Sequence, residues 1–132
     1  MSIELWYWPS VPGRGEFVRL FMEAGEIEYE DMAREEGAEA LVEDMASREG
    51  IRPFAPPYIV DGDLCIGQTA HILAYLSDKH GLGAGELDLD LQLIQLQLDI
   101  SDIVEEVHSV HHPIASSKYY HEQMDAALDK AA

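Results

Sequence analysis

The sequence predicts an α/β domain with the element order βαβ-ββα, followed by amphipathic helices. Three observations predict this organisation. From residue 3 to residue 82, apolar residues change repeatedly between strand spacing and helix spacing. The proline pair Pro56-Pro57 stands directly before a strand, a turn and a second strand. A glycine-rich stretch, residues 81–85, is followed by a segment in which apolar residues repeat at helical spacing.

The first part of the chain has the pattern of a βαβ unit. Residues 3 to 8 predict a buried strand, and residues 16 to 24 carry apolar side chains at helical spacing. Gly25 is expected to end this helix. Residues 27 to 32 alternate apolar and charged side chains, which predicts a half-buried strand. This order predicts parallel strands joined by a right-handed crossover.

The second part continues with a helix, a hairpin and another helix. Apolar spacing within residues 36–49 predicts the first of these helices. Residues 58 to 66 predict two antiparallel strands around an Asp-Gly-Asp turn. The next helix begins at Gln68-Thr69 and is expected to end at a C-cap glycine, Gly81. The order βαβ then ββα is that of a thioredoxin-like domain, which we assign to residues 1–82.

Residues 83–132 are expected to form an α-helical C-terminal part. The apolar pattern predicts a helix over residues 88–112 that Pro113 ends, and a further helix over residues 118–132. Two amphipathic helices cannot bury all of their apolar residues against each other. We therefore expect an exposed apolar stripe and self-association.

The charge balance is strongly acidic. The chain of 132 residues holds 26 acidic and 8 basic residues, a formal net charge of −18. Because the basic residues are scattered, no segment reverses the sign, and binding to nucleic acid or to acidic lipid is disfavoured. The composition is globular, with 47% hydrophobic residues, but no apolar run approaches the length of a membrane span. Neither nucleic acid nor a membrane is an expected partner.

The chain contains one cysteine, Cys65. This excludes an internal disulfide and any Cys-x-x-Cys redox or zinc site. The N-terminus lacks the basic and long apolar segments of a secretory signal. We therefore expect a reducing compartment and a cytoplasmic protein. Cys65 lies between two apolar residues on a predicted strand, so we expect an inert core thiol.

The stretch from Pro56 to Thr69 has the layout of a binding site for a small extended peptide. Pro57 follows another proline at the start of a strand and is expected to have a cis peptide bond. A cis bond would turn the preceding backbone outward, so that its polar groups pair with a ligand instead of the sheet. Gln68-Thr69 opens a helix whose free N–H groups can accept a carboxylate.

This stretch closely resembles the glutathione-binding segment of cytosolic glutathione S-transferases. The N-terminus agrees, with Leu5-Trp6-Tyr7-Trp8-Pro9 followed by Gly13-Arg14-Gly15-Glu16-Phe17-Val18-Arg19-Leu20. The resemblance covers residues 3 to 82 and continues more weakly through residues 108–113 and Tyr119-Tyr120. It implies a thioredoxin-like glutathione-binding domain followed by the start of an all-α domain. It also implies a homodimer that adds the glutathione thiolate to a small electrophilic, apolar substrate in detoxification, with glutathione as substrate and no cofactor.

The resemblance implies a hydroxyl group that keeps the glutathione thiol as thiolate by hydrogen bonding to it. Tyrosine-type transferases suggest Tyr7, because Tyr7-Trp8 precedes Gly13-Arg14 as an aromatic pair precedes glycine in that pattern, although the loop is one residue longer here. Ser10 is the alternative, since residues 10–14 resemble the start of serine-type members and Ser10 would lie nearer the helix N-terminus. A third reading makes Tyr7 a core aromatic residue and Ser10 a loop cap.

The resemblance also implies the residues that hold the tripeptide. Pro56, before Pro57, would pair with the cysteinyl part. Gln68 and Thr69 match the pair that holds the γ-glutamyl carboxylate by side-chain and backbone groups at the helix start. Thr69 as a simple N-cap is compatible with this role.

Further glutathione contacts are implied less directly. Trp8 and Arg14 are candidates for the glycyl or γ-glutamyl ends. In this family an acidic residue of a second subunit often meets the γ-glutamyl ammonium. Glu106 stands at the matching position, with Asp102 one turn earlier, and the alternative for both is a solvated helix face.

Three functions remain open at this stage. One is the transferase, and one is a truncated module that binds glutathione and dimerises without a full catalytic pocket. The third, a thiol-disulfide oxidoreductase, is disfavoured because no cysteine lies between Tyr7 and Gly13. Glu105, His108 and His112 share one helical face, but a single helix supplies them, so we expect a histidine-rich surface and no metal site.

Overall fold

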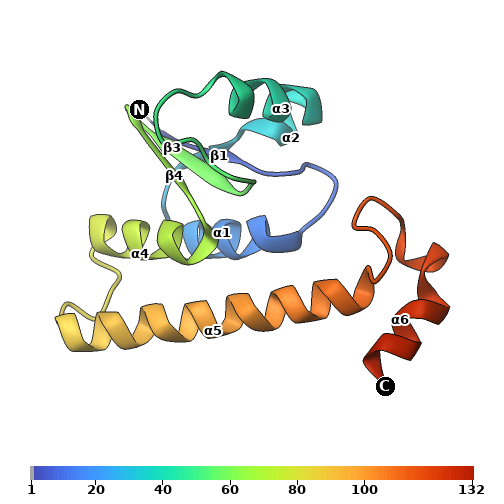
Figure 1. Ribbon diagram of the computed structural model, residues 1–132. Helices are drawn as coiled ribbons and strands as arrows, with labels where there is room; N and C mark the ends of the chain where they lie inside the picture. The colour runs from blue at the N-terminus through green and yellow to red at the C-terminus, as the bar shows by residue number, and fades with distance from the viewer. Residues whose placement is uncertain (1) are drawn as a thin grey trace. The chain divides into compact units, whose positions relative to one another are not determined.

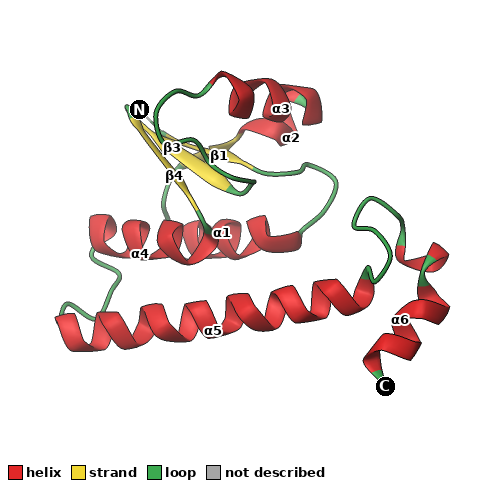
Figure 2. Cartoon of the chain, in the orientation of Figure 1, coloured by secondary structure: helices red, strands yellow, loops and turns green. Residues whose placement is uncertain are grey.

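The computed structural model describes residues 2–132 and contains a four-stranded mixed sheet with helices on both faces (Figure 1). The strands are β1 (Ile3–Trp6), β2 (Tyr29–Asp31), β3 (Tyr58–Asp61) and β4 (Leu64–Gly67), in the spatial order β2-β1-β3-β4. Strand β1 pairs in parallel with β2 and antiparallel with β3, and β3 and β4 form the predicted hairpin. The predicted fold class, βαβ-ββα followed by helices, is confirmed (Figure 2).

Four helices cover the sheet. Helices α1 (Gly13–Ala24) and α4 (Thr69–His80) lie on one face, and α2 (Met32–Glu36) and α3 (Ala38–Ser47) lie on the other (Figure 1). Gly81 follows α4 in the left-handed conformation, with φ of 65°, and donates its N–H to a carbonyl of the last turn. The predicted glycine C-cap is therefore confirmed.

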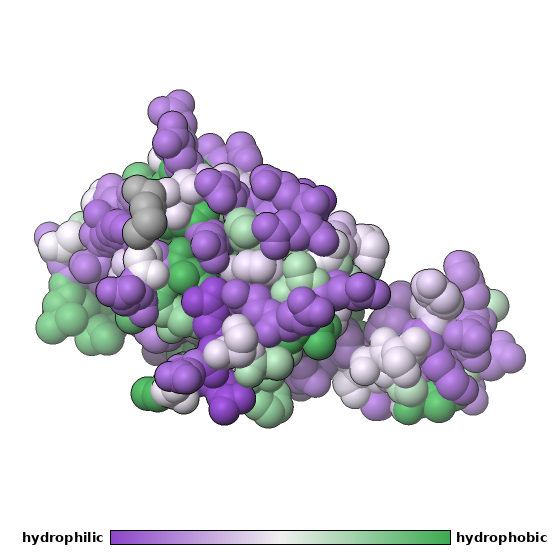
Figure 3. Space-filling model, turned by 90° about the horizontal axis from the view of Figure 1, so that it is seen from above, coloured by the Kyte–Doolittle hydropathy of each residue, from purple (hydrophilic) through white to green (hydrophobic). Residues whose placement is uncertain are grey.

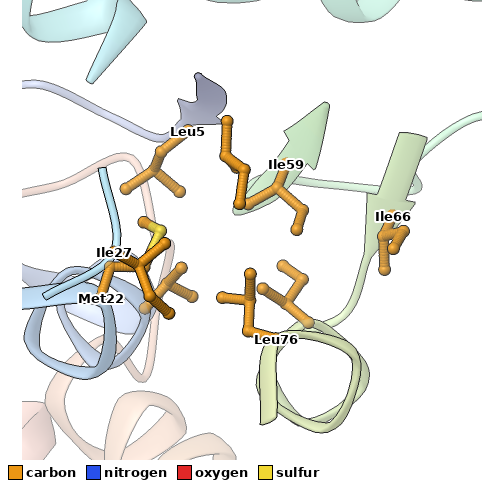
Figure 4. Packing of buried hydrophobic residues seen from close by; sticks show 9 residues of the cluster. Leu5, Met22, Ile27, Ile59, Ile66 and Leu76 are labelled. Atoms are coloured by element: carbon orange, nitrogen blue, oxygen red, sulfur yellow. The ribbon is translucent and has the colours of Figure 1, made fainter. Parts of the chain in front are cut away.

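Each face of the sheet has its own apolar core. Successive strand residues point to opposite faces, so β1 and β3 contribute to both. The α1 and α4 side buries a cluster made of Ile3, Leu5, Val18, Met22, Ile27, Ile59, Ile66, Ile72 and Leu76 (Figure 4). The α2 and α3 side buries Trp6, Ala33, Leu41, Tyr58 and Val60, with the Trp6 and Tyr58 rings stacked at 6.1 Å between centroids. Strands β1 and β3 therefore pack against apolar residues on both faces of the sheet.

Several element boundaries differ from those predicted. Strand β1 ends at Trp6, two residues early, and α1 begins at Gly13, three residues early. Strand β2 covers only Tyr29–Asp31, because Met32 already begins α2. The helix predicted within residues 36–49 is confirmed as α3, Ala38–Ser47. The short helix before it, α2, was not predicted, and Gly37, with φ of 100°, separates the two helices.

The C-terminal part is helical. Helix α5 (Leu87–His111) fits the predicted helix, whereas the helix predicted over residues 118–132 is replaced by a 3-10 turn, η1 (Tyr120–Glu122), and a shorter helix, α6 (Met124–Ala131). The chain divides into two compact units, one ending at Ile94 and one covering Gln95–Ala132. The domain boundary expected between residues 82 and 83 falls in the loop before α5, and the compact units divide later, within α5.

A buried amide organises the turn that follows α5. The Gln123 side chain is 1% exposed. Its Oε1 accepts the N–H groups of Ile114 and Ala115 at 2.8 and 3.0 Å, and its Nε2 donates to the carbonyls of Ala115 and Lys118 at 2.8 and 3.0 Å. One side chain thus supplies the hydrogen bonds that regular structure would otherwise provide.

The surface reflects the acidic composition. The face seen in Figure 3 is largely hydrophilic, with small hydrophobic areas between polar ones. Within residues 2–132, none of the helices combines the length and the apolar character needed to cross a membrane.

Candidate functional site

The sheet register brings three chain segments to the same end of the sheet. Trp6, the last residue of β1, pairs with Tyr58, the first residue of β3, and Tyr58 pairs with Gly67, the last residue of β4. Tyr7 therefore leaves β1, Pro57 enters β3 and Gln68 leaves β4 along one line. Neighbouring strands lie about 4.8 Å apart, so these three backbones span about 10 Å.

Tyr7 lies at the N-terminus of α1 and is 7% exposed. Its Oη accepts the backbone N–H of Arg14 at 3.1 Å. The N-cap residue of α1, Pro12, has no side-chain acceptor, so the phenol oxygen serves one of the helix amides that would otherwise lack a partner. A phenol oxygen that accepts one hydrogen bond still has its own hydrogen to donate.

Two glycines make room for the Tyr7 ring. A Cβ atom at Gly13 would overlap the Tyr7 hydroxyl, and a Cβ atom at Gly15 would overlap the ring itself. Gly13 also has a positive φ of 43°. The glycines at the start of α1 therefore have a steric purpose, because they let the helix pack directly against the phenol.

The other residues predicted near Tyr7 are more exposed. Trp8 is 38% exposed, Arg14 is half-buried on the first turn of α1, and Ser10 is exposed on the turn before Pro12. Of the two predicted hydroxyl groups, the one in contact with the start of α1 is that of Tyr7. Ser10 lies outside the helix, which begins three residues later.

Gln68 is held in a backbone conformation that is rare for its residue type. Its φ and ψ are 70° and 119°, and its carbonyl accepts the N–H of Ile72 at 2.9 Å, the first hydrogen bond of α4. Positive φ in a residue other than glycine costs about 1–3 kcal/mol and is concentrated at ligand-binding positions. Among residues 2–132, no side chain caps α4, and Thr69 is its first residue, half-buried. The N-terminus of this helix is thus suited to an anion.

The Pro56-Pro57 peptide bond is cis, as predicted. Pro57 is buried and Pro56 is half-buried, directly before β3. Because proline has no N–H, Pro56 offers a ligand its carbonyl oxygen alone. We expected both an N–H and a carbonyl to pair with a ligand here, but this backbone can only accept a hydrogen bond, at the Pro56 carbonyl.

The acidic and histidine residues predicted on the long helix belong to the second compact unit. Glu106 is exposed and borders a cavity of about 350 Å³ between the end of α5 and α6. Asp102 is exposed one turn earlier. The rings of His108 and His112 lie 5.0 Å apart between centroids. No group of three or more histidine, cysteine or acidic residues that could hold a metal ion is present among residues 2–132.

Cys65 is a free, half-buried thiol on β4. Burial raises the pKa of this thiol above its ordinary value. The neutral form is therefore favoured, in keeping with the predicted inert role.

Sequence reasoning missed the buried Arg19. It is 2% exposed, and its Nε and Nη1 contact Asp31 at 2.6 Å and Glu16 at 3.1 Å. Burial lowers the pKa of Arg19, but the hydrogen bonds to Asp31 and Glu16 outweigh it, so the pKa is raised and the charge is kept. The spacing of Glu16 three residues before Arg19 is the one signal in the sequence, and it is common on solvated helices.

The packing of Tyr7 predicts the effect of Gly15→Ala. Alanine at an ordinary helix position would stabilise by about 1 kcal/mol relative to glycine, whereas here the new methyl group must displace the ring. We expect a net loss of about 1–3 kcal/mol, measured by urea unfolding. The loss should shrink in the Tyr7→Ala background, where the ring is absent. Equal losses in both backgrounds would show that the ring does not impose the constraint.

Comparison with known proteins gives a structural match. No protein-family model and no curated protein matches this sequence. Among solved structures, 36 chains match, and one is a glutathione S-transferase from the Antarctic clam Laternula elliptica. The two share 17% sequence identity at a TM-score of 0.60, over 99% of this chain and 61% of the clam chain. At this identity the likeness shows the fold, which is that of a thioredoxin-like domain followed by helices, and the chain spans 61% of the clam protein's length.

Proposed function

We propose that this chain binds glutathione at the end of the sheet where β1 and β4 stop and β3 starts. The observation that carries the proposal is the register that aligns Trp6, Tyr58 and Gly67. It brings a buried phenol, the Pro56 carbonyl and the start of α4 to one end of the sheet. The three backbones span about 10 Å, and an extended tripeptide spans about the same length at roughly 3.3–3.6 Å per residue.

The γ-glutamyl end would bind at α4. Its α-carboxylate would accept hydrogen bonds from the uncapped amides at the start of this helix and from the Gln68 and Thr69 side chains. The positive φ of Gln68 turns the chain sharply from β4 into α4, which supports this role. The cysteinyl N–H would donate to the Pro56 carbonyl, and Trp8 and Arg14 would meet the remaining polar groups of the tripeptide. Glu106 of a second subunit, with Asp102 one turn earlier, is the proposed partner of the γ-glutamyl ammonium.

The sulfur would lie at Tyr7. The Tyr7 Oη, already an acceptor for Arg14, would donate its hydrogen to the sulfur and favour the thiolate over the thiol. The released proton goes to solvent. Ser10 is the alternative donor, and its exposed position before α1 makes it the weaker candidate.

The reaction we propose is addition of this thiolate to a small, apolar electrophile, a detoxification chemistry. A carbon–sulfur bond forms from the sulfur lone pair. Either a leaving group departs with its electron pair or the product takes up a proton. Glutathione is a substrate here, and we propose no resident cofactor. A reducing cytoplasm, which supplies glutathione and keeps the free Cys65 reduced, is the proposed compartment.

A second candidate function is a module that binds glutathione and dimerises without a complete electrophile site. The observation that favours it is helix α5, which buries none of its residues and leaves apolar side chains exposed for contact with a second copy. Calorimetry with glutathione and an assay with an aromatic electrophile separate the two. Binding together with turnover supports the transferase, and binding without turnover supports the module.

Gln68→Ala should weaken glutathione binding by about 1–3 kcal/mol, because a charged ligand group loses a hydrogen bond. This corresponds to about a 5- to 150-fold rise in Kd by calorimetry. Gln68→Gly should weaken binding as well, although it relieves the positive φ. Gln92→Ala, at an exposed amide on α5, is the matched control and should leave Kd unchanged. Unchanged affinity in both Gln68 variants would refute the assignment.

Tyr7→Phe should raise the apparent pKa of bound glutathione by about one to two units, the equivalent of one hydrogen bond to a charged group. Ser10→Ala should leave this pKa where it is. The measurement is thiolate absorbance against pH with glutathione bound. Conjugation near neutral pH should slow in Tyr7→Phe, because less thiolate is present. A shift in Ser10→Ala alone would make the serine the thiolate-stabilising group.

We also expect a homodimer or larger assembly. Helix α5 buries none of its residues, and it exposes Leu89, Leu93, Leu96, Ile100 and Val107. Burial of apolar surface stabilises an interface by roughly 25 cal/mol per Å². At moderate salt, repulsion between acidic groups on the two chains is largely screened beyond about 10 Å. Association should therefore strengthen as salt rises, measured by light scattering at micromolar concentration. A monomer at moderate salt would contradict the dimer and remove any role for a partner's Glu106.

A further inference from the structure

A buried positive charge lies over the ring of Tyr7. The guanidinium carbon of Arg19 is 5.7 Å from the ring centroid, within the range of a cation–π interaction. Arg19 is 2% exposed, so water does not weaken this interaction as it would at the surface. The same ring is fixed at its other end, where the Tyr7 hydroxyl accepts the Arg14 N–H.

Arg19 is itself held from two elements. Its Nε contacts Asp31 at the end of β2, and its Nη1 contacts Glu16 one turn earlier on α1. Arg34 approaches the same Asp31 at 3.5 Å and Glu16 at 3.9 Å. Asp31 pairs with Leu5 across the parallel strands, two residues before Tyr7. The ion pairs therefore fix the guanidinium close to the point where β1 ends.

The carboxylates do not use the whole guanidinium. Arg19 Nη2 and Asp31 Oδ1 are buried and make no hydrogen bond within residues 2–132. A buried polar atom of this kind calls for an explanation, since most are paired. An arginine whose only role was to neutralise Asp31 could bind both carboxylate oxygens with two of its nitrogens, in a bidentate ion pair. In this structure Nη2 makes no hydrogen bond to Asp31, while the guanidinium stays against the face of the Tyr7 ring.

We propose that Arg19 is a positioning residue for Tyr7. It holds the ring against α1, and its charge makes the hydroxyl a stronger hydrogen-bond donor toward an anion at the end of the sheet. A nearby cation stabilises the partial negative charge that builds up on the phenol oxygen as its hydrogen is donated to an anion, which strengthens that hydrogen bond. The second part of this inference rests on the proposed function, because the anion in question is the glutathione thiolate.

The test uses the full chain and separates the inference from the proposed function. The first measurement needs no ligand and is a double-mutant cycle on urea unfolding with Arg19→Met and Tyr7→Leu. Arg19→Met leaves Asp31 without its partner, so the cycle is also run in the Asp31→Asn background, which removes that buried charge. Coupling between positions 7 and 19 supports the positioning role. Additive losses in both backgrounds overturn it, whether or not glutathione binds.

The second measurement is the apparent pKa of the thiol of bound glutathione. Arg19→Met should raise it by about one unit, the lower end of the effect of a nearby opposite charge, and Arg19→Lys should restore part of the loss. Glu16→Gln is the matched control, because it alters the same ion-pair network without removing the cation, and it should not raise this pKa. A thiol pKa unaffected by Arg19→Met but raised by Tyr7→Phe overturns the electrostatic part. If the wild type does not bind glutathione, both the proposed function and the electrostatic part of the inference are overturned. The double-mutant cycle then decides the positioning role on its own.

Discussion

The backbone pairing of β1, β3 and β4 is the constraint on which the candidate site depends. Because Trp6, Tyr58 and Gly67 share one line across the sheet, the chain enters or leaves all three strands at the same end. A slip of one residue in any pair would exchange the two faces of a strand and remove its apolar residues from the core. Burial on both faces therefore protects the register. The rigidity of the site is thus a by-product of packing that is needed for folding in any case.

Much of this arrangement can be predicted from the sequence, and the part that cannot has a common cause. Local chemistry predicts the hairpin around residues 61–63, the cis bond at Pro57 and the cap at Gly81, since each depends on a few neighbouring residues. Residues far apart in the chain decide the rest. Gly15 resembles a weak helix residue until the Tyr7 ring is placed against it, and Arg19 resembles a surface residue until Asp31 is brought beside it. Helix α2 was missed because its five residues, Met32–Glu36, are too few for an apolar helical spacing to be recognised.

The acidic surface and the proposed ligand oppose each other in charge. The chain has a formal net charge of −18, and glutathione is an anion near neutral pH, so long-range forces slow their encounter. Under the proposed function, recognition would depend on short-range groups: the amides at the start of α4, the Arg14 side chain and the phenol of Tyr7. These act within a few ångströms and are little affected by salt, whereas the distant repulsion is screened over about 10 Å. If this site binds glutathione, we expect slow association and an affinity that depends on these few short-range contacts.

The Gln123 amide has a consequence for the motions of the turn after α5. The N–H groups of Ile114 and Ala115 lie outside helices and strands, yet both donate to the same buried oxygen. Hydrogen exchange at these two amides requires withdrawal of the Gln123 side chain, which belongs to the residue preceding α6. Their exchange with solvent deuterium would then follow the opening of that helix's first turn, so that an irregular turn acquires the protection pattern of a helix.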